Sequence, residues 1–167
     1  MLRIIAAFAF TSAGGIIGFS MADKLKEARK ICDEISSLFQ RASFLIGYRC
    51  DDVYAVCKNL KSDSEFKDLT FLQYLPDEYN AGEDFRYRWN QALELQKNLG
   101  KEEKELLAYF GSILGKSDVD GQLSSISEIQ KELERIYVVR LENLQKKGRL
   151  YRTTGLLFGV MAGILVI

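Results

Sequence analysis

The chain has two long apolar segments at its ends and a polar middle in which apolar residues recur at helical spacing. Residues 4–22 form an uncharged run of 19 residues, which as a helix is about 28 Å long and matches the roughly 30 Å hydrocarbon core of a bilayer. Residues 153–167 are apolar but number only 15, about 22 Å of helix. They can span if Leu150 and Tyr151 enter the bilayer while Arg149 and Arg152 extend to the interface. The pattern predicts transmembrane helices at 1–22 and 153–167 around a soluble domain of residues 23–152.

The middle of the chain begins with apolar residues at alternating spacings of three and four. These positions are Leu25, Ala28, Cys32, Ile35, Phe39, Ala42 and Ile46. Such spacing places them on one face of a long amphipathic helix that continues out of the first span.

Capping and breaking residues predict where the following helices begin and end. Asp51 can cap a helix that runs to Leu60, Ser64 can start one that ends at Leu75 before Pro76, and Gly100 can end a helix over 83–99. Two more helices are expected, over 101–114 and from Ser117 or Asp118 into the second span. Since no stretch alternates like a strand, we expect an all-α, membrane-anchored bundle of about six helices, with no domain boundary inside 23–152.

The charges indicate which side of a membrane the middle domain faces. Arg3 is the one charged residue outside 23–152, whereas residues 133–152 hold six lysines and arginines. The positive-inside rule therefore favours a cytoplasmic domain and an uncleaved anchor. The alternative is a secretory signal, because Arg3 gives a basic start and Ser20-Met21-Ala22 resembles a cleavage site. In that case the chain is an exported helical binding protein with a C-terminal tail anchor, and whether the first segment is cleaved stays open.

Small residues recur at every fourth position in both apolar segments. They are Gly14, Gly18 and Ala22 in the first segment, and Gly155, Gly159 and Gly163 in the second. Small residues on one helix face let backbones approach closely in lipid, so we expect the two spans to pack through these stripes.

Composition excludes several classes of function. The chain has no histidine, which removes the commonest general base and the usual imidazole ligands of metals. Its three cysteines have no Cys-x-x-Cys spacing, which argues against zinc and fits a reduced compartment, and Cys50 and Cys57 are expected to be a buried pair of thiols. The zero net charge gives no basic field for nucleic acid. We therefore expect no enzyme activity, no cofactor, no metal and no nucleic-acid partner.

One segment invites comparison with a phosphate-binding loop. Gly111-Ser-Ile-Leu-Gly115-Lys116-Ser117 has three residues between its glycines where such a loop has four, and it follows a predicted helix where such a loop follows a strand. We interpret it instead as a tight corner between two helices. Gly115 ends the first helix in the left-handed conformation, and Ser117 or Asp118 caps the second.

The same corner resembles the stage III sporulation protein AB family of endospore-forming bacteria. The family pattern is Phe-Gly-x-x-Leu-Gly-x-x-Asp-x-x-x-Gln, and all six of its positions match. They are Phe110, Gly111, Leu114, Gly115, Asp118 and Gln122. Gly18-Phe19, Gly155, Gly159 and the layout of anchor, helical domain and terminal anchor are also similar to the family. The chain departs from it before the second helix, where Leu45 replaces a glutamate and Asp51-Asp52-Val53 replaces Thr-Pro-Leu.

The resemblance implies a fold similar to the helical domain of type II secretion F proteins, and a structural role. It implies a platform in the mother-cell membrane around the forespore, within the channel complex needed for endospore formation. The implied partners are membrane lipid, a secretion-type ATPase and other sporulation channel proteins, while homo-oligomerisation stays open. The corner, with Lys116 at an exposed tip, is the surface that we expect a partner to contact.

Overall fold

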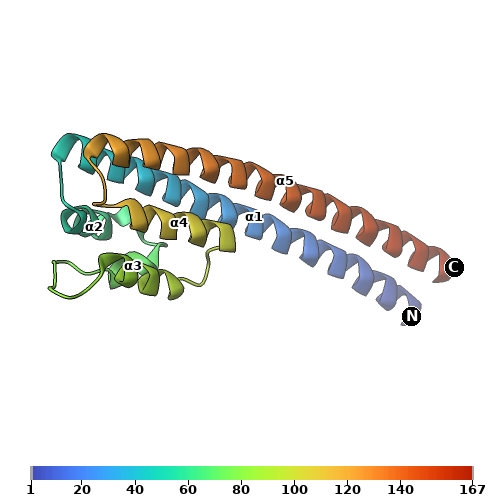
Figure 1. Cartoon of the computed structure of the whole chain (residues 1–167). Helices are drawn as coiled ribbons and strands as arrows, with labels where there is room; N and C mark the ends of the chain where they lie inside the picture. The colour runs from blue at the N-terminus through green and yellow to red at the C-terminus, as the bar shows by residue number, and fades with distance from the viewer. Residues whose placement is uncertain (1, 167) are drawn as a thin grey trace. The chain divides into compact units, whose positions relative to one another are not determined.

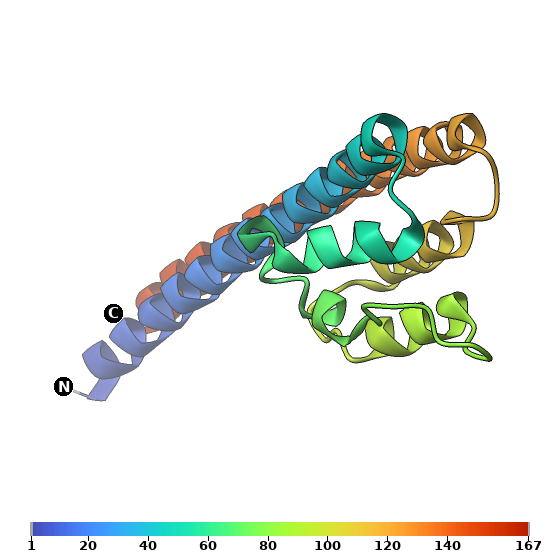
Figure 2. The same cartoon turned by 90° about the vertical axis from the view of Figure 1, so that its left-hand side faces the viewer.

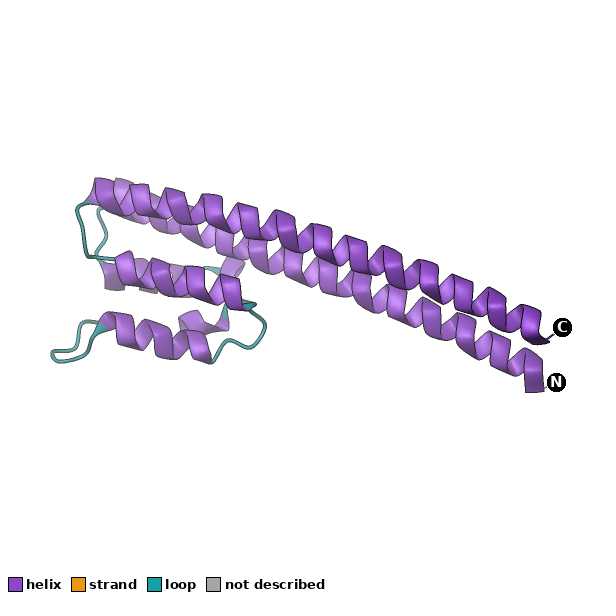
Figure 3. Cartoon of the chain, turned by 45° about the vertical axis from the view of Figure 1, so that its right-hand side comes forward, coloured by secondary structure: helices purple, strands orange, loops and turns teal. Residues whose placement is uncertain are grey.

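A computed structural model describes the backbone of residues 2–166, and the side chains of residues 26–150, 153, 154, 157 and 161. Over these backbone positions the chain forms five α-helices, two short 3₁₀ segments and no strand (Figure 3). In chain order the elements are α1 (Leu2–Arg49), α2 (Val53–Ser62), η1 (Ser64–Phe66), η2 (Thr70–Tyr74), α3 (Phe85–Glu94), α4 (Lys101–Ile113) and α5 (Val119–Val166). The predicted all-α class is confirmed.

The chain divides into two compact units, and the two long helices α1 and α5 contribute to both. Residues 1–29 and 137–167 form the first unit, which we call the terminal hairpin. Residues 30–136 form the second, which we call the helical domain. The predicted continuation of one helix from the first apolar segment to Ile46 is confirmed by α1.

In the terminal hairpin, the beginning of α1 and the end of α5 run side by side in opposite directions (Figure 1). Arg29 Nε donates a hydrogen bond of 2.9 Å to the Tyr137 hydroxyl, which ties the two helices together.

In the helical domain, the other halves of α1 and α5 lie side by side, and the shorter helices complete the domain (Figure 2). The face of α1 that the spacing predicted is buried, with Ile35, Phe39 and Ala42 fully inaccessible. Trp89 is also fully buried, and its indole Nε1 donates to the Leu107 carbonyl at 2.8 Å. A buried tryptophan needs such a partner because its N–H has lost water.

The predicted helix from Ser64 to Leu75 is wrong, since the segment forms η1 and η2 instead. Four of its five buried residues, Phe66, Leu69, Leu72 and Leu75, recur every three positions, and each of the last three donates its N–H to the carbonyl of the one before, at 3.0–3.2 Å. A three-residue period matches 3₁₀ geometry, not the 3.6-residue period of an α-helix.

Two predicted helix ends are also wrong. Asp52, not Asp51, caps α2 by accepting the Ala55 N–H at 2.8 Å, while Asp51 pairs with Arg49. Helix α3 ends at Glu94, well before Leu99. Gly100 is the residue before α4, and its backbone is extended, with φ −71° and ψ 167°. Gly100 therefore starts a helix and does not stop one.

Candidate functional site: the corner between α4 and α5

The corner begins with two residues of α4 that pack against aromatic rings. Phe110 is fully buried, with its ring centroid 5.0 Å from that of Phe39 and 5.6 Å from that of Trp89. Gly111 lies against the same tryptophan so closely that an added Cβ would be 2.3 Å from Trp89 Cδ1. No side chain fits that gap without displacing a buried indole, so glycine is required by the packing.

The turn itself needs a second glycine. Leu114 is buried and is the C-cap residue directly after α4, and Gly115 has a φ of +70°. An added Cβ at Gly115 would also lie 2.7 Å from Val53 Cγ2. The predicted left-handed conformation at Gly115 is confirmed, and both backbone strain and steric contact oppose a larger residue there.

Asp118 and Gln122 hold the start of α5. Asp118 Oδ1 accepts the Gly121 N–H at 3.1 Å, so it is Asp118 that caps the helix. Gln122 reaches back across the turn: its Oε1 accepts the Gly115 N–H at 3.0 Å, and its Nε2 donates to the Ser117 carbonyl at 2.9 Å. A glutamine is suited to this position because one side chain supplies both an acceptor and a donor.

All six motif residues of the corner thus have a role in building it. The residues left for contact with other molecules are Lys116, Ser117, Val119 and Asp120, which are exposed. The segment follows helix α4, as predicted, and therefore lacks the strand-to-helix setting of a phosphate-binding loop. Within the described residues, no three histidine, cysteine or carboxylate side chains gather as metal ligands would.

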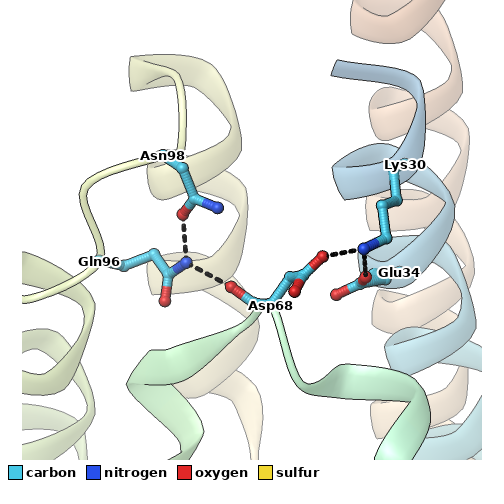
Figure 4. Close-up of polar contacts among 5 residues, drawn as sticks. All are labelled: Lys30, Glu34, Asp68, Gln96 and Asn98. Atoms are coloured by element: carbon cyan, nitrogen blue, oxygen red, sulfur yellow. Dashed lines mark hydrogen bonds and ion pairs between the residues drawn. The ribbon is translucent and has the colours of Figure 1, made fainter. Parts of the chain in front are cut away.

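A second polar cluster, which the sequence did not reveal, lies inside the helical domain between α1 and the loop before η2 (Figure 4). Lys30 donates to the Asp68 carboxylate and lies 3.8 Å from Glu34 Oε1. Glu34 is buried, and burial, reinforced by the negative charge of Asp68, raises the pKa of its carboxyl group. The hydrogen bond from Lys30 lowers the pKa of Asp68.

Gln96 connects this cluster to α3 and is itself almost fully buried. Its Oε1 accepts from the Thr70 hydroxyl at 2.8 Å and from the Phe71 N–H at 2.9 Å. Its Nε2 donates to the Asp68 carbonyl at 2.8 Å and to the Asn98 side chain (Figure 4). The signal in the sequence was a glutamine at helical spacing from Trp89 and Leu93, on the side that proved to be buried.

The cysteines do not form the expected buried pair. Cys57 is buried in α2, and burial raises the pKa of its thiol to about 12. Cys50 is exposed and follows the last residue of α1. It has a positive φ of 52°, which turns the chain so that the Asp51 N–H donates to the Leu45 carbonyl at 3.2 Å. Cys32 is buried on α1. Cys50 is therefore the exposed thiol of the described part of the chain.

The predicted transmembrane packing residues fall on side chains outside the described set. They are Gly14, Gly18, Ala22, Gly155, Gly159 and Gly163. Their packing stays a prediction. Within the residues that the structure describes, no helix is both long enough and apolar enough to cross a membrane.

The sequence profile of one family, stage III sporulation protein AB, matches residues 3–167. No individual curated protein and no solved structure matches the sequence. The match covers nearly the whole chain. The chain belongs to the stage III sporulation protein AB family, which implies a role at stage III of sporulation.

Proposed function

We propose that the chain is a non-enzymatic membrane platform in the channel complex between the mother cell and the forespore. Its helical domain faces the mother-cell cytoplasm, and both ends of the chain anchor it in the membrane around the forespore. Its partners are a secretion-type ATPase and other channel proteins of sporulation.

The corner between α4 and α5 is the observation that carries this proposal. Its six motif residues pack, turn or cap, and each is accounted for by a contact within the fold. An enzyme family would be expected to keep reactive side chains exposed in a shared motif, because catalysis needs groups that reach a substrate. A motif made of internal contacts specifies a shape, which supports a scaffold.

The membrane anchoring rests on the charge pattern of the chain. The two uncharged ends are followed or preceded by lysines and arginines on the side of the helical domain, as expected for segments whose basic flanks stay in the cytoplasm. The alternative function, an exported binding protein with a cleaved signal, places the same domain on the opposite side of the membrane.

Cysteine labelling separates the two functions, and the structure selects the cysteine to use. Cys50 is exposed whereas Cys32 and Cys57 are buried, so an impermeant maleimide reports on Cys50 in the folded chain. The full chain is produced in growing cells, where export would place the domain outside the cell. We expect labelling only after permeabilisation, and none in a Cys50→Ser variant.

Labelling of Cys50 in intact protoplasts would contradict the cytoplasmic platform. A mature chain that begins at Asp23 would independently support the exported protein. A denatured sample, in which all three thiols react, serves as the reference for complete labelling.

A further inference from the structure

The end of α5 carries basic residues without acidic ones. From residue 143 to the chain end there are four lysines and arginines and no aspartate or glutamate. Lys146, Lys147 and Arg149 are exposed within this stretch. The nearest preceding acid is Glu142. Its Oε2 lies 3.4 Å from Lys146 Nζ, one turn further along α5, and both side chains are exposed. With this acid counted, residues 142–152 hold four basic side chains and one acidic one, a net formal charge of +3, so the segment presents a net positive charge.

An exposed apolar stripe follows these basic residues on the same helix. Leu150, Leu157 and Met161 are 62%, 59% and 57% exposed, and their spacings of seven and four place them on one face of α5. The hydroxyl groups of Thr153 and Thr154 donate to the carbonyls of Arg149 and Leu150 at 2.9 and 2.8 Å. Because these hydroxyls are satisfied within the helix, they do not require water beside the stripe.

The terminal hairpin also determines what lies beside the basic residues. The hydrogen bond between Arg29 and Tyr137 sets these two residues at one level of the antiparallel pair. At 1.5 Å per residue, Arg149 lies about 18 Å beyond Tyr137, and the α1 residue an equal distance beyond Arg29 is Ile17. Residue 17 belongs to the uncharged run 4–22. By the same count Lys146 and Lys147 are level with residues 20 and 19 of that uncharged run, and the first acid of α1, Asp23, lies about 4.5 Å along the axis from residue 20.

We propose that Lys146, Lys147 and Arg149 bind the headgroup phosphates of anionic phospholipids, while Leu150, Leu157 and Met161 contact the acyl chains. This inference rests on the membrane anchoring of the proposed function. Phosphate complements the net positive charge of this segment. The long aliphatic stems of lysine and arginine allow the charged group to reach the headgroup level from a helix that enters the bilayer. The adjoining apolar stripe matches the hydrocarbon part of the same molecule, which a soluble phosphate compound lacks.

Spin-labelled lipids measure this preference directly. The full chain is reconstituted in phosphatidylcholine vesicles that contain trace spin-labelled phosphatidylglycerol or phosphatidylcholine, and the motionally restricted fraction of each is compared. We expect the chain to restrict phosphatidylglycerol roughly twofold or more in preference to phosphatidylcholine. Raising the salt concentration should reduce this preference without any mutation. Inorganic phosphate at matched ionic strength should leave it unchanged.

Substitution tests whether the three basic residues cause the lipid preference. The triple change Lys146→Gln, Lys147→Gln, Arg149→Gln should bring the ratio of the two restricted fractions close to one. The matched control, Lys58→Gln, Lys97→Gln, Lys131→Gln, removes the same charge from exposed positions of the helical domain and should keep the wild-type ratio.

Each failure has a distinct meaning. An unchanged preference in the first triple variant, or a preference insensitive to salt in the wild type, would overturn the lipid site. Competition by inorganic phosphate would assign the charge to a free phosphate compound and overturn it as well. If no lipid of either kind were restricted, the membrane anchoring in the proposed function would fail instead, whereas restricted lipid without headgroup preference would refute the lipid site alone.

Discussion

At two positions of the corner, the packing and the backbone conformation allow only glycine. Gly111 and Gly115 are both glycines of the corner, but they are required for different reasons. Gly111 has helical backbone and is fixed by its distance to Trp89, whereas Gly115 is fixed by its positive φ as well as by Val53. The helical spacing in the sequence could indicate a turn at Gly115, but it could not reveal the contact at Gly111, because that contact joins residues 22 positions apart in sequence.

The contact at Gly111 predicts a large effect from a single methyl group. Gly111→Ala places a Cβ within 2.3–2.5 Å of three atoms of the Trp89 indole, so the ring or the helix must shift, and we expect a loss of about 1–3 kcal/mol in unfolding free energy. The matched control is Gly148→Ala on α5, where an added Cβ meets nothing within 4 Å. There we expect no loss, and a gain of up to about 1 kcal/mol from helix propensity. Chemical unfolding of the full chain in mild detergent measures both, and equal effects would contradict the packing argument.

The raised pKa of Glu34 predicts that the stability of the folded chain depends on pH. Its pKa is raised in the folded chain, chiefly by burial. The folded state therefore binds the proton more tightly than the unfolded state, and the cost of ionising Glu34 grows as the pH rises above the ordinary glutamate pKa of 4.5. Glu34→Gln removes this cost. We expect the variant to become more stable than the wild type as the pH rises through that window, and the two to converge at lower pH, where both side chains are neutral.

Asp68 provides the control of opposite sign for that experiment. Its pKa is lowered by the hydrogen bond from Lys30, so its contribution to stability is present above its ordinary pKa of about 3.8 and is lost as the pH falls through the lowered value. Asp68→Asn should therefore destabilise the domain at neutral pH. A pH-independent difference between Glu34→Gln and the wild type would show that the ionisation of Glu34 does not matter.

Elements were predicted well where a long amphipathic pattern ran without interruption. The periodic residues of α1 indicated its buried face, because burial along a straight helix repeats every 3.6 residues. The segment from Ser64 to Leu75 was predicted as a helix from the capping Ser64 and the breaking Pro76 alone, whereas its apolar period of three belongs to 3₁₀ geometry. The end of α3 could not be predicted, because Gln96 leaves the helix to bind Thr70 and Phe71, which lie about 25 residues earlier.

The contribution of the Asp118 cap of α5 to stability can be measured by substitution. Asp118→Ala removes the acceptor of the Gly121 N–H, and we expect a loss of about 0.5–2 kcal/mol in unfolding free energy. Asp118→Ser and Asp118→Asn keep a capping oxygen and should retain most of the stability. If all three variants were equally stable, the hydrogen bond would not contribute to holding the corner.

At the scale of the whole molecule, the corner explains how the helical domain is built, whereas the chain ends carry the proposed membrane anchoring. The family profile spans both, but the contacts that build the corner lie within the helical domain. From the sequence, the corner could be recognised as a turn with a cap, and both features are confirmed at Gly115 and Asp118. The role of Gln122 could not, since a glutamine that bonds to two backbone groups across a turn leaves no periodic signal.

A substitution at the exposed tip of the corner distinguishes a corner that binds a partner from one that only maintains the fold. Lys116 is exposed, and its backbone N–H bonds to the Ile113 carbonyl at 3.2 Å, so its side chain can change while the turn is kept. If the corner docks on the secretion-type ATPase of the proposed complex, Lys116→Glu should abolish co-purification of the full chain with that ATPase while the unfolding free energy changes by less than about 0.5 kcal/mol. Lys58→Glu reverses the same charge at an exposed site on α2 and should leave co-purification intact. Loss in both variants would indicate a general effect of charge, and retention in both would mean that the corner serves the fold and that the platform contacts its partner through another surface.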